Sequence, residues 1–96
     1  MPRTPIHPSE ILAAELVELG ISAAELARVI HVPANRISQI LAGKRNITAD
    51  TALRLGRWFG TGPQLWLNLQ QTYELDLARQ ELGDELEAIA PRTTAA

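Results

Sequence analysis

The shortest break between two helical patterns constrains the fold of this chain more than any other feature. One pattern starts at Ser22, which can form a capping box with Glu25, and runs to about Ile30; the next is opened by Pro33. A break of about three residues is too short for the two helices to lie antiparallel, so they must cross steeply. This is the spacing of a helix-turn-helix, which we place over about residues 22–43.

The rest of the chain is also helical in composition. Alanine and leucine supply 28 of the 96 residues, and no segment alternates apolar and polar residues as a strand would. We therefore predict an all-α fold of five helices in one domain over residues 1–82. The helices outside the helix-turn-helix run from Pro8 to Gly20, from Thr48 to Gly60, and over about 62–82, starting at Pro63 or at Thr61 capped with Gln64. From Gly83 we expect an acidic extension and a frayed tail, over residues 83–96.

Composition excludes several classes of function. The chain has no cysteine, and its two histidines, His7 and His31, are too few for a metal cluster. It contains no HExxH, phosphate-binding glycine loop or GxSxG motif, so most enzyme templates fail. Apolar residues never run for the roughly 20 positions of a bilayer span, and no apolar signal segment is visible. We expect a soluble cytoplasmic protein that is not an enzyme and has no cofactor, metal or membrane partner.

Charge is sorted along the chain, although the net charge is only −2. Residues 28–58 hold six basic residues and one acidic residue, whereas residues 1–27 carry a net charge of −3 and residues 59–96 one of −4. A basic middle between acidic ends is typical of a polyanion-binding site. A solvent-exposed surface that happens to be sorted explains it equally well, so charge alone leaves both interpretations open.

On a helical wheel with about 100° per residue, the helix after Pro33 has two distinct faces. The inward stripe is apolar: Ile37, Ile40 and Leu41. The opposite stripe consists of Asn35, Gln39 and Ala42, flanked by Arg36 and Ser38. Asparagine and glutamine amides match the major-groove edge of adenine, and long cations at the helix exit reach phosphates. We therefore predict a DNA-contacting set: Ala34, Asn35, Arg36, Ser38, Gln39, Lys44 and Arg45.

Several motifs in the chain resemble known families. SAAELA at 22–27 and ISQILAGK at 37–44 resemble the phage-repressor-like (Xre/Cro) helix-turn-helix. Three further segments are similar to the HigA (VapI-like) antitoxins of bacterial type II toxin–antitoxin modules: HPSEIL at 7–12, GKRNITADTALRL at 43–55 and FGTGPQLWLNLQ at 59–70. The resemblance covers roughly residues 5–80, in three separated motifs that are highly specific for the family.

This resemblance implies a function and a set of partners. It implies an antitoxin that binds double-stranded DNA as a homodimer, at an inverted-repeat operator in its own promoter, and represses its own operon. It also implies a cognate HigB-like toxin, a ribosome-dependent mRNA endonuclease, which the antitoxin neutralises. The chain departs from the pattern of such units at two places. His31 occupies a turn position that is commonly glycine, and Ala23 and Ala24 stand where a phosphate-binding glutamine is often found.

The partner surfaces are less well defined by the sequence. The helix over about 62–82 is the candidate dimerisation helix, through Trp66, Leu67, Leu69, Tyr73 and Leu77, although aromatic residues at these positions also suit a core. This chain has two acidic surfaces that are candidates for binding a basic toxin. One is the first helix, with Glu10, Glu15 and Glu18, and the other is the acidic C-terminal face from Glu74 to Glu87.

Three other functions compete with the antitoxin. A stand-alone Xre-type regulator without a toxin is the main alternative, and one chain does not separate the two. A second alternative is a protein-binding adaptor, in which the helix over 33–43 does not contact DNA. A small hydrolase using Ser38 or Ser22 with His31 fails, because no carboxylate is placed to orient the histidine and Ser22 is needed as a cap.

Overall fold

The computed structural model describes residues 4–93, which form six helices joined by short loops. They are α1 (Pro8–Leu19), α2 (Ala23–Val29), α3 (Ala34–Leu41), α4 (Ala49–Phe59), α5 (Pro63–Leu82) and α6 (Asp84–Ala88). The prediction of an all-α fold is confirmed, and the five expected helices are all present. The sixth helix, α6, was not predicted, because the sequence pattern after Gly83 showed acidic residues and no apolar stripe. Residues 94–96 of the expected frayed tail lie outside the described part of the chain.

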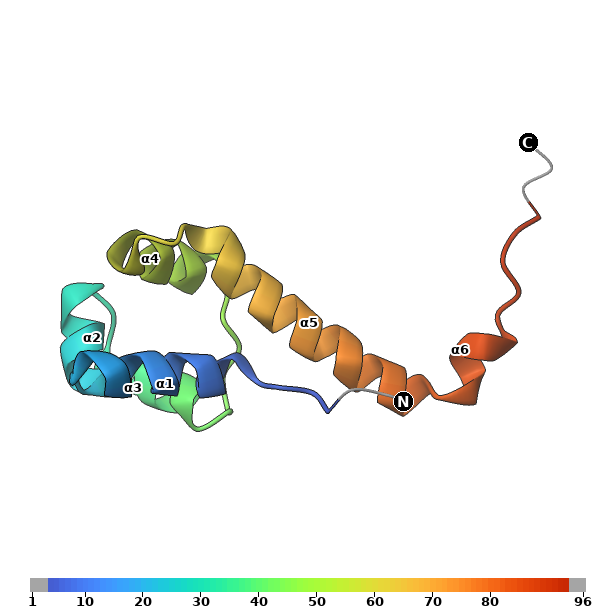
Figure 1. Cartoon of the computed structure of the whole chain (residues 1–96), viewed down its shortest axis with the longest axis horizontal. Helices are drawn as coiled ribbons and strands as arrows, with labels where there is room; N and C mark the ends of the chain where they lie inside the picture. The colour runs from blue at the N-terminus through green and yellow to red at the C-terminus, as the bar shows by residue number, and fades with distance from the viewer. Residues whose placement is uncertain (1–3, 94–96) are drawn as a thin grey trace.

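The molecule is elongated, with extents of 54 × 27 × 21 Å. Helices α1 to α4 pack together with the start of α5, whose remaining length projects away from them and carries α6 at its far end (Figure 1). The core lies entirely within the packed end. It consists of Leu12, Leu16, Leu26, Ala27, Ile30, Ile37, Ile40, Ile47, Ala52, Leu55 and Trp66.

Local signals in the sequence start the helices where they were expected. The Ser22 side chain accepts a hydrogen bond from the Glu25 amide at 3.1 Å, and the Glu25 carboxylate accepts one from the Ser22 amide at 3.1 Å, which confirms the capping box. Pro63 takes the first position of α5. The alternative start at Thr61 is wrong, because the Thr61 hydroxyl instead accepts a hydrogen bond from Trp66 Nε1 at 3.1 Å.

Glycine is required where α4 passes the start of α5. Gly56 lies inside α4, and a Cβ atom on it would overlap the backbone carbonyl of Gly62. The Gly62 amide donates to the Gly56 carbonyl oxygen at 3.1 Å, so the two backbones are in direct contact. This close approach fixes the angle between α4 and α5. Among the described helices, these two form the most extensive contact.

Candidate nucleic-acid interface

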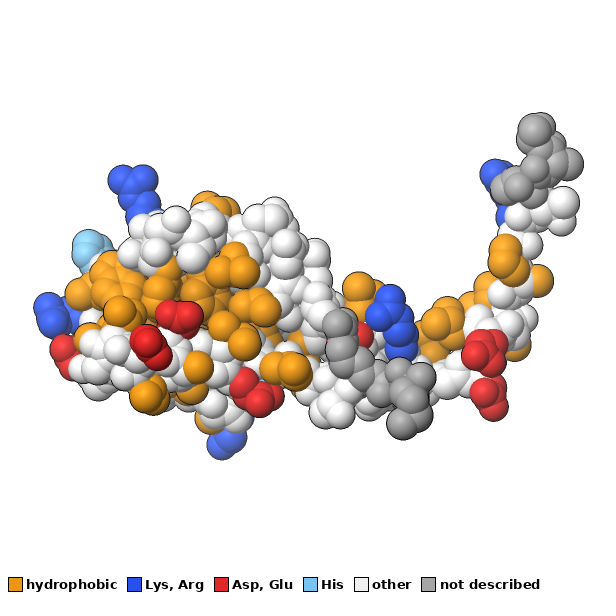
Figure 2. Space-filling model, viewed as in Figure 1, with side chains coloured by type: hydrophobic (Ala, Val, Ile, Leu, Met, Phe, Trp, Pro, Cys, Tyr) orange, Lys and Arg blue, Asp and Glu red, His pale blue; other side chains and the backbone are white. Residues whose placement is uncertain are grey.

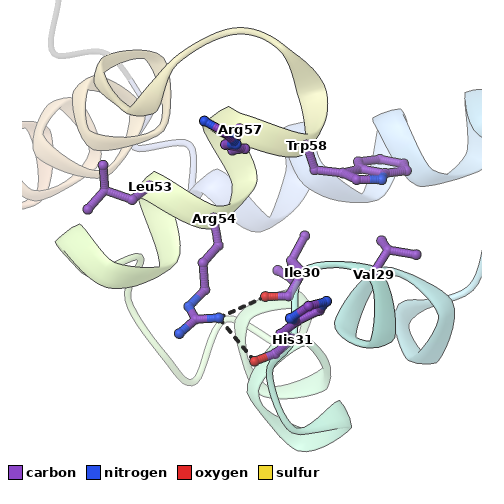
Figure 3. Close-up of a pocket in the computed structure, with 7 residues that line it drawn as sticks. All are labelled: Val29, Ile30, His31, Leu53, Arg54, Arg57 and Trp58. Carbon is purple, nitrogen blue, oxygen red and sulfur yellow. Dashed lines mark hydrogen bonds between the residues drawn. The ribbon is translucent and has the colours of Figure 1, made fainter.

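The turn between α2 and α3 contains a left-handed residue. His31 has φ of 61° and is the only non-glycine residue with a positive φ among residues 4–93. Its carbonyl oxygen and that of Ile30 both accept hydrogen bonds from Arg54 Nη1, at 3.1 and 2.9 Å (Figure 3). A side chain of α4 therefore satisfies the polar backbone atoms that this turn leaves unpaired.

Helix α3 presents the two faces expected of it. Ile37 and Ile40 are completely buried and Leu41 is half-buried. On the outer face Asn35 is exposed and Gln39 is half-buried, and neither side chain forms a hydrogen bond to any residue in the range 4–93. Their amide groups are therefore available to a ligand, as base recognition requires.

Two other predicted contact residues are already engaged within the chain. The Ser38 hydroxyl donates to the Ala34 carbonyl oxygen at 3.1 Å, so its hydrogen is used inside α3. Arg36 Nη1 donates to Asp50 Oδ1 at 3.0 Å, across the gap between α3 and α4. Asp50 lies in the first turn of α4, and nothing in the sequence indicates a pairing over 14 positions.

The cations Lys44 and Arg45 follow α3 through a tight reversal. Gly43 has φ of 74°, its amide donates to the Ile40 carbonyl at 2.9 Å, and the Lys44 amide donates to the Gln39 carbonyl at 2.9 Å. This is a Schellman motif, a helix end that glycine commonly forms. Both cationic side chains are exposed, and neither forms an ion pair within the described residues.

A buried amide anchors the loop that carries these cations. The Gln70 side chain, 3% exposed on α5, accepts a hydrogen bond from the Ile47 amide through Oε1 at 2.8 Å. Ile47 itself is buried in the core. The loop is thus held at its C-terminal end by α5 and at its N-terminal end by the Schellman motif.

A polar groove of about 480 Å³ lies between the end of α3 and the start of α4. It is lined by Arg36, Arg45, Asn46, Thr48, Asp50 and Thr51. The hydrogen bond that Asp50 accepts from Arg54 is the main reason why its pKa lies below the usual value of an aspartate, and the nearby charges of Arg54 and Arg36 act in the same direction. The groove therefore combines cations with one carboxylate that stays ionised.

Acidic and basic side chains are both distributed along the length of the molecule. In Figure 2, acidic side chains lie over the packed helices and around α6, and lysine and arginine side chains project from the edges of the packed helices, from α5 and near the C-terminal end. Within residues 4–93, no group of His, Asp and Glu side chains could hold a metal ion. No helix in that range is long and apolar enough to cross a membrane.

The structure corrects part of the predicted dimer surface. Trp66 is 1% exposed and packs on Phe59 with ring centroids 5.2 Å apart, so it cannot contact a second copy, and its place in the dimer set is wrong. The other four predicted residues, Leu67, Leu69, Tyr73 and Leu77, are half-buried. The apolar surface that α5 leaves uncovered lies on its other side, where Leu75 and Leu82 are 54% and 42% exposed.

Known proteins match both this sequence and this fold. Residues 12–66 match a family described as helix-turn-helix. A solved HigA-family antidote protein of an addiction module from Coxiella burnetii is 49% identical, with a TM-score of 0.90 over 93% of this chain and 99% of that one. The chain belongs to the HigA family of antitoxins. This membership confirms the resemblance drawn from the three motifs and the expectation of an antitoxin rather than an enzyme.

Two further relatives extend the comparison. The antitoxin HigA of Pseudomonas aeruginosa, solved with the higBA promoter, is 46% identical, with a TM-score of 0.87 over 94% of this chain and all of that one. Virulence-associated protein I of Dichelobacter nodosus is 47% identical over 90 residues, which are 93% of this chain and 82% of the relative. The similarity therefore includes α5 and the helix-turn-helix together.

Proposed function

We propose that this HigA-family antitoxin binds an inverted-repeat operator in double-stranded DNA through the outer face of α3. The observation that carries the proposal is the pair of unengaged amides, Asn35 and Gln39, beside the unpaired cations Lys44 and Arg45. The amides suit base edges and the cations suit phosphates. The Pseudomonas aeruginosa HigA solved with the higBA promoter supports the same mode of action. We further propose that the protein is cytoplasmic, because its operator would lie on the chromosome.

A pair of double variants tests this assignment. Asn35→Ala with Gln39→Ala removes the two proposed base contacts and should lower the preference for DNA from the chain's own promoter over scrambled DNA by about 1–3 kcal/mol per lost contact. Gln64→Ala with Asn68→Ala is the matched control, because it removes the same two residue types, four positions apart, from the exposed side of α5. Fluorescence anisotropy with both DNAs measures the preference. An unchanged preference in the first variant would favour an adaptor that never reads DNA.

We further propose that the protein acts as a homodimer, since an inverted repeat presents two half-sites related by a two-fold axis. The projecting part of α5 supports this, because Leu75, Ala78 and Leu82 fall on one stripe at helical spacing and are all exposed. The half-buried residues Leu69, Tyr73 and Leu77 lie on the opposite side of α5. Leu75→Glu with Leu82→Glu should convert a dimer into a monomer in sedimentation, whereas Val17→Glu, at an 82% exposed site on α1, should not. A native chain that is monomeric at tens of micromolar would contradict the dimer.

The proposed toxin partner is an RNA-cutting, HigB-like protein, as antitoxin membership suggests. Co-expression of the neighbouring reading frame with this chain tests the pairing, because the chain should restore growth if the neighbour is toxic. Charge reversal then separates the two acidic surfaces: Glu15→Lys with Glu18→Lys on α1, or Asp84→Lys with Glu85→Lys on α6. Loss of rescue in one variant alone locates the toxin site. A harmless neighbour would favour the stand-alone regulator.

A further inference from the structure

We propose that Asp50 is a positioning residue for DNA recognition, which holds the Arg36 guanidinium so that its remaining N–H groups meet a base edge in the major groove. The proposal rests on the proposed operator binding and adds a residue that lies outside the recognition helix. Asp50 belongs to the first turn of α4, and the predicted DNA-contacting set did not include it.

One carboxylate oxygen joins two arginines from different helices. Asp50 Oδ1 accepts from Arg36 Nη1 at 3.0 Å and from Arg54 Nε at 2.8 Å. The Arg36 side chain is 28% exposed and that of Asp50 is 58% exposed, so the pair lies at the edge of the groove, where DNA has access to it.

Asp50 is held in place independently of Arg36. Arg54, which donates to it, is itself fixed by its hydrogen bonds to the carbonyl oxygens of Ile30 and His31 in the turn (Figure 3). The chain of contacts therefore runs from the turn through Arg54 and Asp50 to Arg36 on α3. Because the carboxylate is fixed before DNA arrives, it restricts the rotamers of Arg36 in advance.

The chemistry of arginine allows it to serve Asp50 and a base together. A guanidinium carries several N–H donors in a rigid plane, and the structure shows only one nitrogen of Arg36 donating to Asp50. The donors that remain suit the O6 and N7 acceptors of guanine, which arginine contacts in pairs. An orientation fixed by Asp50 would therefore favour guanine at one position of each half-site.

Simple electrostatics and the positioning role predict different effects of removing Asp50 on DNA affinity and on sequence discrimination. A carboxylate in a DNA-facing groove repels phosphates, so its loss should strengthen binding to every DNA sequence. If Asp50 orients Arg36, its loss should instead weaken the discrimination between operator and non-operator DNA. The ratio of the two affinities thus separates a positioning role from a merely repulsive charge.

The experiment measures this ratio for the full chain by fluorescence anisotropy at one fixed salt concentration. We expect Asp50→Ala to lower the ratio about tenfold, while binding to scrambled DNA stays equal or becomes tighter. Glu74→Ala is the matched control, since it removes the same charge from an exposed position on α5 and should leave the ratio unchanged. Asp50→Glu keeps the charge at the start of α4 but moves the carboxylate, so it should also lower the ratio. This variant tests the same role if the alanine variant does not fold.

A double-mutant cycle with Arg36→Ala completes the test. The effect of Asp50→Ala should disappear in the Arg36→Ala background, because there is then no guanidinium to orient. Operator preference that survives Asp50→Ala, or an equal loss with and without Arg36, would overturn this inference alone. A wild-type chain with no operator preference would overturn the proposed operator binding, and this inference with it.

Discussion

Arg54 Nη1 of α4 donates to the His31 carbonyl oxygen at 3.1 Å, so the left-handed residue of the turn is tied to the helix that follows the recognition helix. The same guanidinium donates through Nε to Asp50 at 2.8 Å. One arginine therefore links the geometry of the turn to the ion pair at the edge of the polar groove between α3 and α4. This explains how a turn without the usual glycine keeps its shape.

The His31 backbone provides a prediction of stability. A left-handed conformation costs a non-glycine residue roughly 1–2 kcal/mol, and a glycine would remove that cost while adding some freedom to the unfolded chain. We expect His31→Gly to raise the free energy of unfolding by up to about 1 kcal/mol, and His31→Val to lower it by more than that. Urea denaturation measures both variants. A glycine variant less stable than the wild type would show that the His31 side chain contributes more than its backbone costs.

His7 provides a prediction of pH dependence. Its Nδ1 accepts a hydrogen bond from the Ser9 amide at 3.0 Å as the N-cap of α1, and its ring contacts Tyr73 with centroids 4.9 Å apart. Burial lowers the pKa of His7, and the charge of Glu10 offsets only part of this shift. The unfolded state therefore binds more protons just below the ordinary histidine pKa of about 6.5.

The sign of the effect follows from that difference. Stability contributed by neutral His7 is complete above about pH 6.5 and is lost as the pH falls toward the lower pKa of the folded state. Chemical denaturation at several pH values should show this loss in the wild type. His7→Asn keeps an N-cap acceptor but does not titrate, so its stability should vary less over the same range. An identical pH dependence in both proteins would assign the effect to another group.

Gln70 provides a prediction for the loop between α3 and α4. Its replacement by leucine leaves the buried Ile47 amide without its acceptor, which should cost about 1–3 kcal/mol of stability. Gln71→Leu, at the adjacent exposed position, is the matched control and should change stability little. Thermal denaturation distinguishes the two. Equal effects would mean that the hydrogen bond to Ile47 does not stabilise the loop.

Lys44 and Arg45 provide a prediction of salt dependence. If both contact phosphates, Lys44→Ala with Arg45→Ala should reduce the slope of log affinity against log salt by about 0.9 per lost contact. The relative preference among DNA sequences should stay nearly unchanged, because phosphate contacts carry no base information. Titrations at several salt concentrations measure both quantities. A lost preference with an unchanged slope would contradict the division of roles between α3 and the loop.

The sequence was sufficient for features set by neighbouring residues. The capping box at Ser22 and the start of α5 at Pro63 each follow from a few adjacent positions, and the structure confirms them. Features set by distant residues were not predictable. Helical periodicity placed Trp66 on α5, but only the packing of α4 against α5 shows that it is buried.

The same limit applies within the candidate site. The outer face of α3 followed from helical spacing alone, because that spacing is fixed by the backbone. The pairing of Arg36 with Asp50 depends on how closely α3 approaches the start of α4, which no local pattern encodes. Charge sorting indicated a basic region correctly but did not show that one of its arginines is held by the region's only carboxylate.

The central claim is that the outer face of α3 reads operator sequence, and a base-pair scan tests it most directly. The affinities of the wild type and of Asn35→Ala are measured for operator duplexes in which each base pair is changed in turn. We predict that the wild type loses affinity at positions placed symmetrically about the centre of the inverted repeat, and that Asn35→Ala becomes insensitive at one symmetric pair of them. Identical profiles for the two proteins would contradict the claim.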